Sequence, residues 1–300
     1  MAGREGRRKP VPRRSSFRSI AALMLIPICG FVVFVFYRFV RDHVELNAPR
    51  ANTAAMVTRL RGHEVAPAPE TPKPRNSATA PKGQLVLIID DVGFDHQPLD
   101  AAMHIDPNLN FSVLPNAQHA HEFAEELHNA GFEVLCHLPM EPVDYPRQSP
   151  GKNAVMTAMT DAQIAETTRE DIAAVPHAAG VNNHMGSRAT SDPRVMRAVL
   201  TSLPKGMFFI DSMTTSKSVA QRVAREMRVP TAARQVFLDD VQEEAAVRKQ
   251  LAQLMADAAQ RGTAIGIGHM YPVTVRVLSE AAPELRAKGF RFVRASEAVD

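Results

Sequence analysis

The stretch Leu85-Val-Leu-Ile-Ile-Asp-Asp91 predicts a buried strand that ends in two carboxylates. Its five apolar residues leave neither face of the strand polar, which is typical of a parallel sheet covered on both sides. Further short apolar runs follow at residues 111–114, 132–138, 180–182, 207–210, 236–238, 264–267 and 290–293. Longer amphipathic stretches separate these runs. Residues 84–300 therefore predict one domain of the α/β class, a barrel of parallel strands surrounded by helices.

The stretches between the apolar runs carry helix signals. Thr160-Asp-Ala-Gln163 has the pattern of a capping box, which satisfies free backbone amides at the start of a helix. A second helix is expected to start near Ser191 and Asp192-Pro193. Gly262 is a good stop for a helix over residues 241–261. Helices are therefore expected to alternate with the strands along the domain.

Polar residues that can ionise or bind metal end six of the apolar runs. They are Asp90-Asp91, His137, Asn182-Asn183-His184, Asp211, Asp239-Asp240 and His269. One such ending would mean little, because Asp and Asn commonly begin loops. Six are informative, since the carboxyl ends of the strands in a parallel barrel meet at one rim, where substrates bind. The sequence therefore predicts a functional site at this rim.

The residue types at the rim point to metal chemistry. One Asp and two His on converging strand ends form a mixed oxygen–nitrogen set that suits Zn²⁺ or another mid-row divalent ion. Three protein ligands and one open position are typical of a catalytic site, because the open position holds water whose pKa falls to about 7. A neighbouring carboxylate can take the proton of that water, and a histidine can protonate the leaving group. This set predicts hydrolysis of an amide or an ester.

Five motifs at these strand ends also form a recognisable combination. They are Asp90-Asp91 after an apolar strand, His137-Leu-Pro-Met-Glu141, Val181-Asn-Asn-His-Met-Gly-Ser187, Phe209-Ile-Asp-Ser212 and Ile267-Gly-His269. Together they resemble the divergent polysaccharide deacetylase family, distant relatives of the metal-dependent, NodB-like carbohydrate deacetylases, over residues 84–298. The resemblance implies a distorted (β/α) barrel of seven or eight strands that removes acetyl groups from amino sugars. It also implies one divalent metal ion as cofactor, and Zn²⁺ is the expected one.

The resemblance assigns roles to individual residues. It implies that Asp90 acts as the general base and His269 as the general acid. Asp91 and His137 are then the carboxylate ligand and the first histidine ligand of the metal. Asp211 is expected beside these catalytic residues, where it orients a histidine or caps a loop.

The sequence departs from the family pattern in two places. The usual second metal histidine, four residues after the first, is replaced by Glu141. Glu141 is one candidate for the third metal ligand, and His184 is the one we favour. The arginine–proline–tyrosine element of typical deacetylases, which helps to bind acetate, is not visible. Arg188 or Arg234 is a candidate to restrain Asp90 in its place.

Charge is unevenly distributed along the chain. Residues 1–83 carry 15 Lys/Arg and 5 Asp/Glu, whereas residues 84–300 carry 20 Lys/Arg and 27 Asp/Glu. The N-terminal part is therefore basic and the predicted domain is acidic. A protein that binds nucleic-acid phosphates needs the opposite arrangement, so we expect no nucleic-acid partner.

The N-terminal residues predict attachment to a membrane. Residues 1–18 are a basic tail, and the uncharged run from Ile20 to Tyr37 can form ~27 Å of helix, close to the thickness of a hydrocarbon core. A cleaved signal peptide needs small residues after its apolar run, but bulky ones stand there, so an uncleaved signal anchor over residues 19–41 is favoured. The basic residues before it predict a cytoplasmic N-terminus. Residues 42–83 are rich in proline and predict a disordered linker.

These observations predict a metal-dependent deacetylase that is anchored in the inner membrane and faces the periplasm. Its expected partner is an acetylated envelope glycan such as peptidoglycan. One alternative is a non-catalytic scaffold that binds glycan or metal and has lost turnover. A further alternative is an amidase that acts on a substrate other than a sugar.

Overall fold

The computed structural model describes residues 81–300. The predicted tail 1–18 and signal anchor 19–41 lie outside the described residues, as does the linker 42–83 except for Pro81 to Gly83. No helix within residues 81–300 is long and apolar enough to cross a membrane. All residues predicted for the strand-end site fall within the described part.

The strands form one sheet in which every pairing is parallel. Their order is β6-β5-β4-β3-β2-β1-β8-β7, and β9 pairs with the amino end of β1. They are β1 (Gly83–Val92), β2 (Asn110–Val113), β3 (Glu133–Met140), β4 (Ala178–Met185), β5 (Phe208–Asp211), β6 (Thr231–Ala233), β7 (Val236–Phe237), β8 (Thr263–His269) and β9 (Phe290–Phe292). Every predicted apolar run lies in or overlaps a strand. The three-residue β6 is the strand within residues 81–300 that the sequence did not indicate.

The sheet curves into a barrel that is not fully closed. Among the described residues no pairing joins β6 to β7, the two ends of the strand order. The C-terminal segment crosses the amino ends of the strands instead. There, the Ala295 amide donates to Asn110 Oδ1 at 2.9 Å, and the Thr231 amide donates to the Asp300 carbonyl at 3.1 Å. The predicted α/β class is confirmed, and the architecture is a parallel half-barrel with helices.

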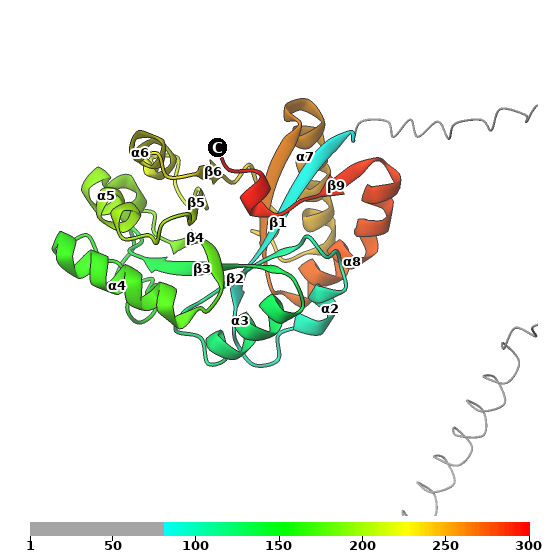
Figure 1. The fold of residues 1–300 in the computed structure, drawn as a ribbon. Coiled ribbons are helices and arrows are strands. Elements are labelled where there is room, and N and C mark those ends of the chain that lie inside the picture. The colour runs from blue at the N-terminus through cyan, green and yellow to red at the C-terminus, as the bar shows by residue number, and fades with distance from the viewer. Residues whose placement is uncertain (1–80) are drawn as a thin grey trace, which may run out of the picture. The chain divides into compact units, whose positions relative to one another are not determined.

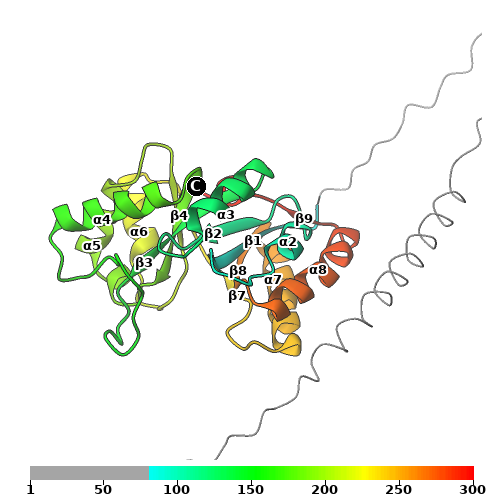
Figure 2. The ribbon, with the colours of Figure 1, turned by 90° about the horizontal axis from the view of Figure 1, so that it is seen from below.

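Helices cover the outer side of the curved sheet (Figures 1 and 2). They are α2 (Leu99–Met103), α3 (Ala120–Asn129), α4 (Asp161–Ala174), α5 (Pro193–Thr201), α6 (Ala220–Met227), α7 (Glu244–Arg261) and α8 (Pro272–Ala287). The capping box at Thr160 is confirmed at the start of α4. Asp192, not Ser191, caps α5, because its carboxylate accepts hydrogen bonds from the first free amides of that helix. Gly262 follows α7 with a φ of 87°, a conformation that favours glycine.

The side chains of β1 alternate between two apolar cores. Leu85, Leu87 and Ile89 belong to the larger cluster, which fills the space between sheet and helices. Val86 and Ile88 belong to a smaller cluster inside the barrel. Both faces of the strand are thus buried, which explains its uninterrupted apolar run. The same alternation determines which strand-end side chains can reach the interior of the barrel.

Candidate functional site

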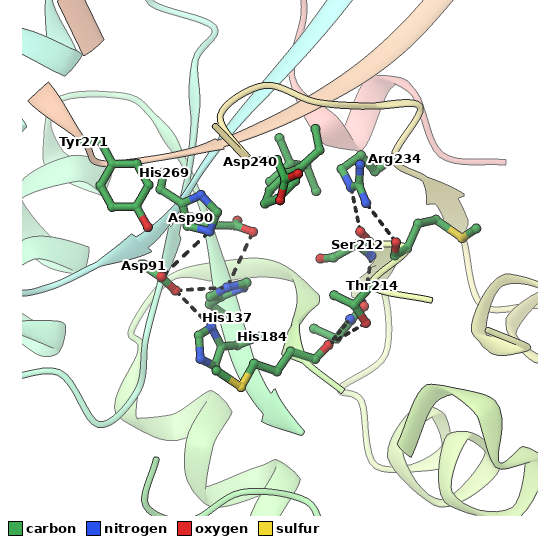
Figure 3. Close-up of a pocket in the computed structure, with 15 residues that line it drawn as sticks. Asp90, Asp91, His137, His184, Ser212, Thr214, Arg234, Asp240, His269 and Tyr271 are labelled. Carbon is green, nitrogen blue, oxygen red and sulfur yellow. Dashed lines mark hydrogen bonds and ion pairs between the residues drawn. The ribbon is translucent and has the colours of Figure 1, made fainter. Parts of the chain in front are cut away.

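Strand alternation places three of the predicted residues in one cavity. Asp90, His137 and His269 each stand two residues after a side chain of the interior cluster, so each points into the open carboxyl end of the barrel. The register of β1 and β8 sets Asp90 opposite His269. All three line a cavity of about 480 Å³. Figure 3 shows them side by side at one end of it.

Asp91 reaches the same cavity because the backbone leaves the regular strand. Simple alternation would turn its side chain towards the helices. Its φ is 58°, in the left-handed region, and the pairing of β1 with β2 shifts register between Ile89 and Val92. A left-handed non-glycine residue is uncommon, and such strain is found often at functional sites. Asp91 thereby lines the cavity beside Asp90.

Asp91, His137 and His184 form a compact cluster. One possible ligand atom of each lies within 4.8 Å of the others. Asp91 Oδ1 is 3.0 Å from His184 Nδ1 and 3.3 Å from His137 Nε2 (Figure 3). The two histidines come from the neighbouring strands β3 and β4, whose register places them at the same end of the sheet. Folding therefore gathers the three residues that the sequence nominated as metal ligands.

The surroundings of Asp91 fit a divalent cation. Asp91 Oδ1 is buried and accepts no hydrogen bond, although two imidazole nitrogens face it. A carboxylate oxygen and two imidazole nitrogens are a typical donor set for Zn²⁺ and similar ions. Burial raises the pKa of Asp91, but His137 and His184 outweigh it and hold that pKa below its ordinary value. The carboxylate is thus kept in the charged form that a metal requires.

Asn182 holds two of the site residues. Its Oδ1 accepts a hydrogen bond from His137 Nδ1 at 2.8 Å, and its Nδ2 donates to Asp90 Oδ1 at 2.8 Å. Ser112 also donates to Asn182 Oδ1. Because Nδ1 of His137 donates to Asn182, Nε2 is the ring nitrogen directed at Asp91 and the one available to bind a metal. Asn182 therefore sets both the tautomer of His137 and the position of Asp90.

Asp239 holds His269 in a similar way. Asp239 Oδ1 lies 2.9 Å from His269 Nδ1, and Oδ2 accepts hydrogen bonds from the His269 amide and the Thr274 hydroxyl. His269 Nε2 is left facing the cavity, 3.8 Å from Asp91 Oδ2. Burial lowers the pKa of His269, but Asp239 and Asp90 outweigh it and raise that pKa to about 9. The ring also packs on Tyr271, with centroids 5.2 Å apart.

Asp90 is almost fully buried, and no arginine within residues 81–300 pairs with it. Burial raises its pKa, while the nearby imidazoles of His137 and His269 lower it. Its Oδ2 is 3.5 Å from His137 Nε2. Of the two candidate arginines, Arg188 pairs with another carboxylate, and Arg234 lines the cavity without an ion pair to Asp90 in the described part of the chain. Asn182 therefore performs the restraint that the sequence suggested for an arginine.

Two residues considered from the sequence lie away from the cavity. Asp211 follows Phe209 on the helix-facing side of β5, and its carboxylate accepts hydrogen bonds from the Met213 amide and the Ser218 hydroxyl. It caps the following loop, the second of its two expected roles, and does not contact a histidine. The Glu141 carboxylate binds the amide and hydroxyl of Thr157 at 2.6 and 2.7 Å. Neither carboxylate joins the cluster.

Sequence reasoning did not identify the residue that positions His269 or the other side chains that line the cavity. Asp239 ends an apolar run, so the strand-end pattern included it, but nothing in the sequence linked it to His269. Arg234, Phe237 and Tyr271 also line the cavity. Arg234 and Tyr271 follow the ends of β6 and β8, and Phe237 is the last residue of the two-residue β7. The sequence indicated Arg234 only as a candidate to restrain Asp90, and no sequence signal distinguished Phe237 or Tyr271.

Comparison with known proteins identifies relatives of the domain. Residues 87–299 match the sequence model described as divergent polysaccharide deacetylase. The uncharacterized protein YibQ of Escherichia coli K12 is 38% identical over 199 residues, which are 66% of this chain and 62% of that protein. An uncharacterized protein of Haemophilus influenzae is also 38% identical over 199 residues, 66% of this chain and 70% of its own length. The match thus spans less than two thirds of the Escherichia coli relative.

A solved structure shares the fold. The crystal structure of an uncharacterized protein from Agrobacterium tumefaciens C58 aligns with a TM-score of 0.68 and 21% sequence identity. The alignment covers 74% of this chain and 91% of that one. At this identity the likeness establishes the arrangement of strands and helices alone.

Proposed function

The chain belongs to the divergent polysaccharide deacetylase family, and from this premise we propose that it is a metal-dependent hydrolase that removes acetyl groups from an envelope carbohydrate. The acetyl groups are N- or O-linked. The observation that carries the proposal is the cluster of Asp91, His137 and His184 at the mouth of the barrel. Family membership supplies the substrate class, and the cluster supplies a place for the metal.

The proposed mechanism gives each residue of the cavity a task. Asp91, His137 and His184 would hold a divalent ion, with Zn²⁺ as the expected one. When bound, such an ion supplies Lewis-acid polarisation of the acetyl carbonyl. Asp90, which Asn182 holds beside the cluster, is placed to take the proton of the attacking water.

His269 would act as the general acid. Asp239 accepts a hydrogen bond from Nδ1–H, so the ring presents Nε2 to the cavity. From there Nε2 can protonate the departing amine or alkoxide. The buried, fully hydrogen-bonded Asp239 fixes the direction of this donation, in the way that a carboxylate orients a catalytic histidine.

The cellular location is proposed from the sequence of the N-terminal residues. A signal anchor over residues 19–41 with a basic tail before it would place the domain outside the cytoplasm, on the periplasmic side of an inner membrane. An enzyme held there would meet acetylated peptidoglycan or another envelope polysaccharide. Protease protection of the full chain in spheroplasts tests this orientation.

Metal analysis and acetate release test the proposal on the full-length protein purified in detergent. We expect one divalent ion per chain, lost in Asp91→Ala, His137→Ala and His184→Ala. We expect acetate from acetylated chitooligosaccharides or peptidoglycan, reduced at least ~10²-fold in Asp90→Asn, which keeps its metal. Full metal content in all three ligand variants would refute the assignment of the cluster.

A non-catalytic scaffold is the second candidate. It is favoured by one observation, because Asp90 has no arginine partner within the described residues and receives its side-chain hydrogen bond from Asn182. A scaffold would bind acetylated glycan without releasing acetate. Binding to peptidoglycan together with no acetate release, in protein loaded with metal, would decide for this candidate.

A further inference from the structure

The guanidinium of Arg234 is fixed at the wall of the cavity. Nε donates to the Ser212 carbonyl at 2.6 Å, and Nη2 donates to the Met213 carbonyl at 2.8 Å. The guanidinium also lies over the Phe237 ring, with Cζ 4.7 Å from its centroid. Three contacts therefore define its orientation, and they leave Nη1 without a hydrogen-bond partner among residues 81–300.

This positive charge is half-buried and has no carboxylate paired with it. Asp90, Asp211 and Asp240 are near enough to favour its charged form, although burial lowers the pKa of Arg234. No Asp or Glu oxygen in the described part of the chain lies within 4.0 Å of its nitrogens. A partly desolvated guanidinium ordinarily gains a bidentate anion partner. Arg234 lines the cavity, where an anionic group of a ligand can reach it.

A second polar group at the same place also lacks a partner. The residue Ser212 is 5% exposed, and its buried Oγ makes no hydrogen bond with any group of residues 81–300. Its backbone is held because its amide donates to Asn183 Oδ1 at 2.9 Å. In Figure 3, Ser212 and Arg234 lie across the cavity from Asp91, His137 and His184. Ser212 and Arg234 thus both line the part of the cavity that lies across from the metal cluster.

We infer that Arg234 and Ser212 form a subsite for an anionic oxygen group of the substrate, a carboxylate or a phosphate. The inference rests on the proposed function, because it concerns the sugar that carries the acetyl group. It makes the preferred substrate an acetylated sugar that also bears a negative charge, at the side of the cavity opposite the metal cluster. A neutral chitin-like chain offers these donors only uncharged oxygen acceptors, which bind a guanidinium more weakly than a carboxylate or a phosphate does.

Three sugars that share the acetylated amine test the inference by direct binding. They are N-acetylglucosamine, N-acetylmuramic acid, which adds a carboxylate, and N-acetylglucosamine 6-phosphate. Titration calorimetry on the full-length Asp90→Asn protein avoids turnover. We expect at least one anionic sugar to bind ~10-fold or more tightly than the neutral one, and the preferred anion identifies the source of the charge. Equal affinity for all three would overturn the inference.

Variants assign the preference to this subsite. Arg234→Gln should abolish the preference for the anionic sugar, and Ser212→Ala should reduce it ~3-fold without loss of an existing hydrogen bond. Arg222→Gln, which removes an exposed charge on α6, should leave it unchanged. If Arg234→Gln does not fold, Ser212→Ala still decides. A preference that survives Arg234→Gln, or an unchanged preference in Ser212→Ala when the other variant is unfolded, refutes the subsite.

The test also separates this inference from the proposed function. Repeating the titrations after chelation of metal removes any binding of the anion to the cluster, and we expect the preference to persist. An intact preference without acetate release would contradict the proposed deacetylase and leave the subsite standing. Acetate release from neutral and anionic sugars at equal KM would keep the deacetylase and refute the subsite.

Discussion

Asp91 at the end of β1 and Asp171 in α4 each have one buried carboxylate oxygen that accepts no hydrogen bond. Asp91 Oδ1 faces the imidazole nitrogens of His137 and His184. Asp171 Oδ2 forms no ion pair within residues 81–300, while its other oxygen accepts from Asn153 Nδ2 at 2.8 Å. A buried carboxylate oxygen without a hydrogen bond thus occurs both at the carboxyl end of the sheet and on the buried face of α4. The electrostatic surroundings of the two oxygens are opposite.

The two surroundings shift the two pKa values in opposite directions. At Asp91 the two histidines outweigh burial and hold the pKa below its ordinary value. At Asp171 burial, with a smaller contribution from Glu170, outweighs the hydrogen bond from Asn153 and raises the pKa to about 7. An unpartnered carboxylate oxygen therefore indicates a metal site only where other ligand atoms point at it. Elsewhere it indicates a carboxyl group that folds in its neutral form.

The largest expected contrast is in metal binding. Asp91→Asn should weaken Zn²⁺ binding at least ~10³-fold, equivalent to about 4 kcal/mol, because the cluster loses its charged oxygen ligand. Asp171→Asn should leave Zn²⁺ binding unchanged. Thermal unfolding with and without Zn²⁺ measures both variants. At a Zn²⁺ concentration of ~100 Kd, the wild type and Asp171→Asn should gain about 2.7 kcal/mol of stability.

Equal stabilisation of Asp91→Asn and Asp171→Asn by Zn²⁺ would contradict the proposed difference between the two carboxylates. Loss of Zn²⁺ stabilisation in Asp171→Asn would mean that α4 and the rim are coupled. Full stabilisation of Asp91→Asn would mean that the ion binds elsewhere. Atomic emission analysis of the same samples shows whether the ion is bound at all.

The next contrast is in the pH dependence of stability. Asp171 keeps its proton in the folded state up to about pH 7, whereas the unfolded chain loses it near pH 4. The folded state binds more protons between these values, so this group lowers the stability as pH rises from about 4 to 7, by at most about 4 kcal/mol. Asp171→Asn removes that decrease and should be more stable than the wild type at pH 8, with little difference at pH 4.

Urea unfolding between pH 4 and pH 8 measures the effect as the difference between variant and wild type. Glu166→Gln is the matched control, since Glu166 is exposed on the same helix. It should not change the slope of stability against pH. A difference between Asp171→Asn and wild type that stays constant across the range would show that Asp171 is not the titrating group.

Much of the fold and part of the site could be predicted from the sequence. Apolar runs located the strands, because both faces of a parallel strand are buried. The rule that strand ends meet at one rim brought Asp90, His137 and His269 together, since these residues continue the alternation of the interior face. The same period-two pattern places Asp211 on the helix side, behind Phe209. Counting positions within each run would have excluded it from the cavity.

The features that could not be predicted depend on departures of the backbone from regular strand geometry and on the conformations of loops. The left-handed conformation of Asp91 has no composition signal, yet it places that carboxylate among the histidines. Arg234 follows the three-residue β6, and Tyr271 lies in the short connection between β8 and α8, so tertiary packing sets the direction of both side chains. The inward position of Asp171 was recoverable, because it lies seven residues after Ile164 and beside Ile172 on the apolar face of α4. An acidic residue in such a stripe is itself a signal of an unusual pKa.

Asp239 is a third buried carboxylate, and both of its oxygens have hydrogen-bond partners. Asp239→Asn should lower kcat for acetate release ~10–100-fold, because an amide cannot stabilise the protonated His269 ring as a carboxylate does. Metal content and KM should change little. Asp240→Asn is the matched control, since Asp240 is exposed and makes no hydrogen bond within residues 81–300. Equal losses in both variants would show a general charge effect on the cavity and refute a positioning role.

Substitution of Glu141 has the smallest expected effect on Zn²⁺ affinity, and it tests whether Glu141 or His184 is the third metal ligand. It stands where related deacetylases have a histidine, but its carboxylate is held by the Thr157 amide and hydroxyl and lies 3.4 Å from Arg188 Nε. Glu141→Gln keeps one oxygen acceptor for Thr157, so we expect a loss of about 1 kcal/mol of stability and less than ~3-fold change in Zn²⁺ affinity. His184→Gln, the matched change, should weaken binding far more. If Glu141→Gln instead weakens Zn²⁺ binding as strongly as His184→Gln, the loop after β3 moves when the ion binds and Glu141 is the third ligand.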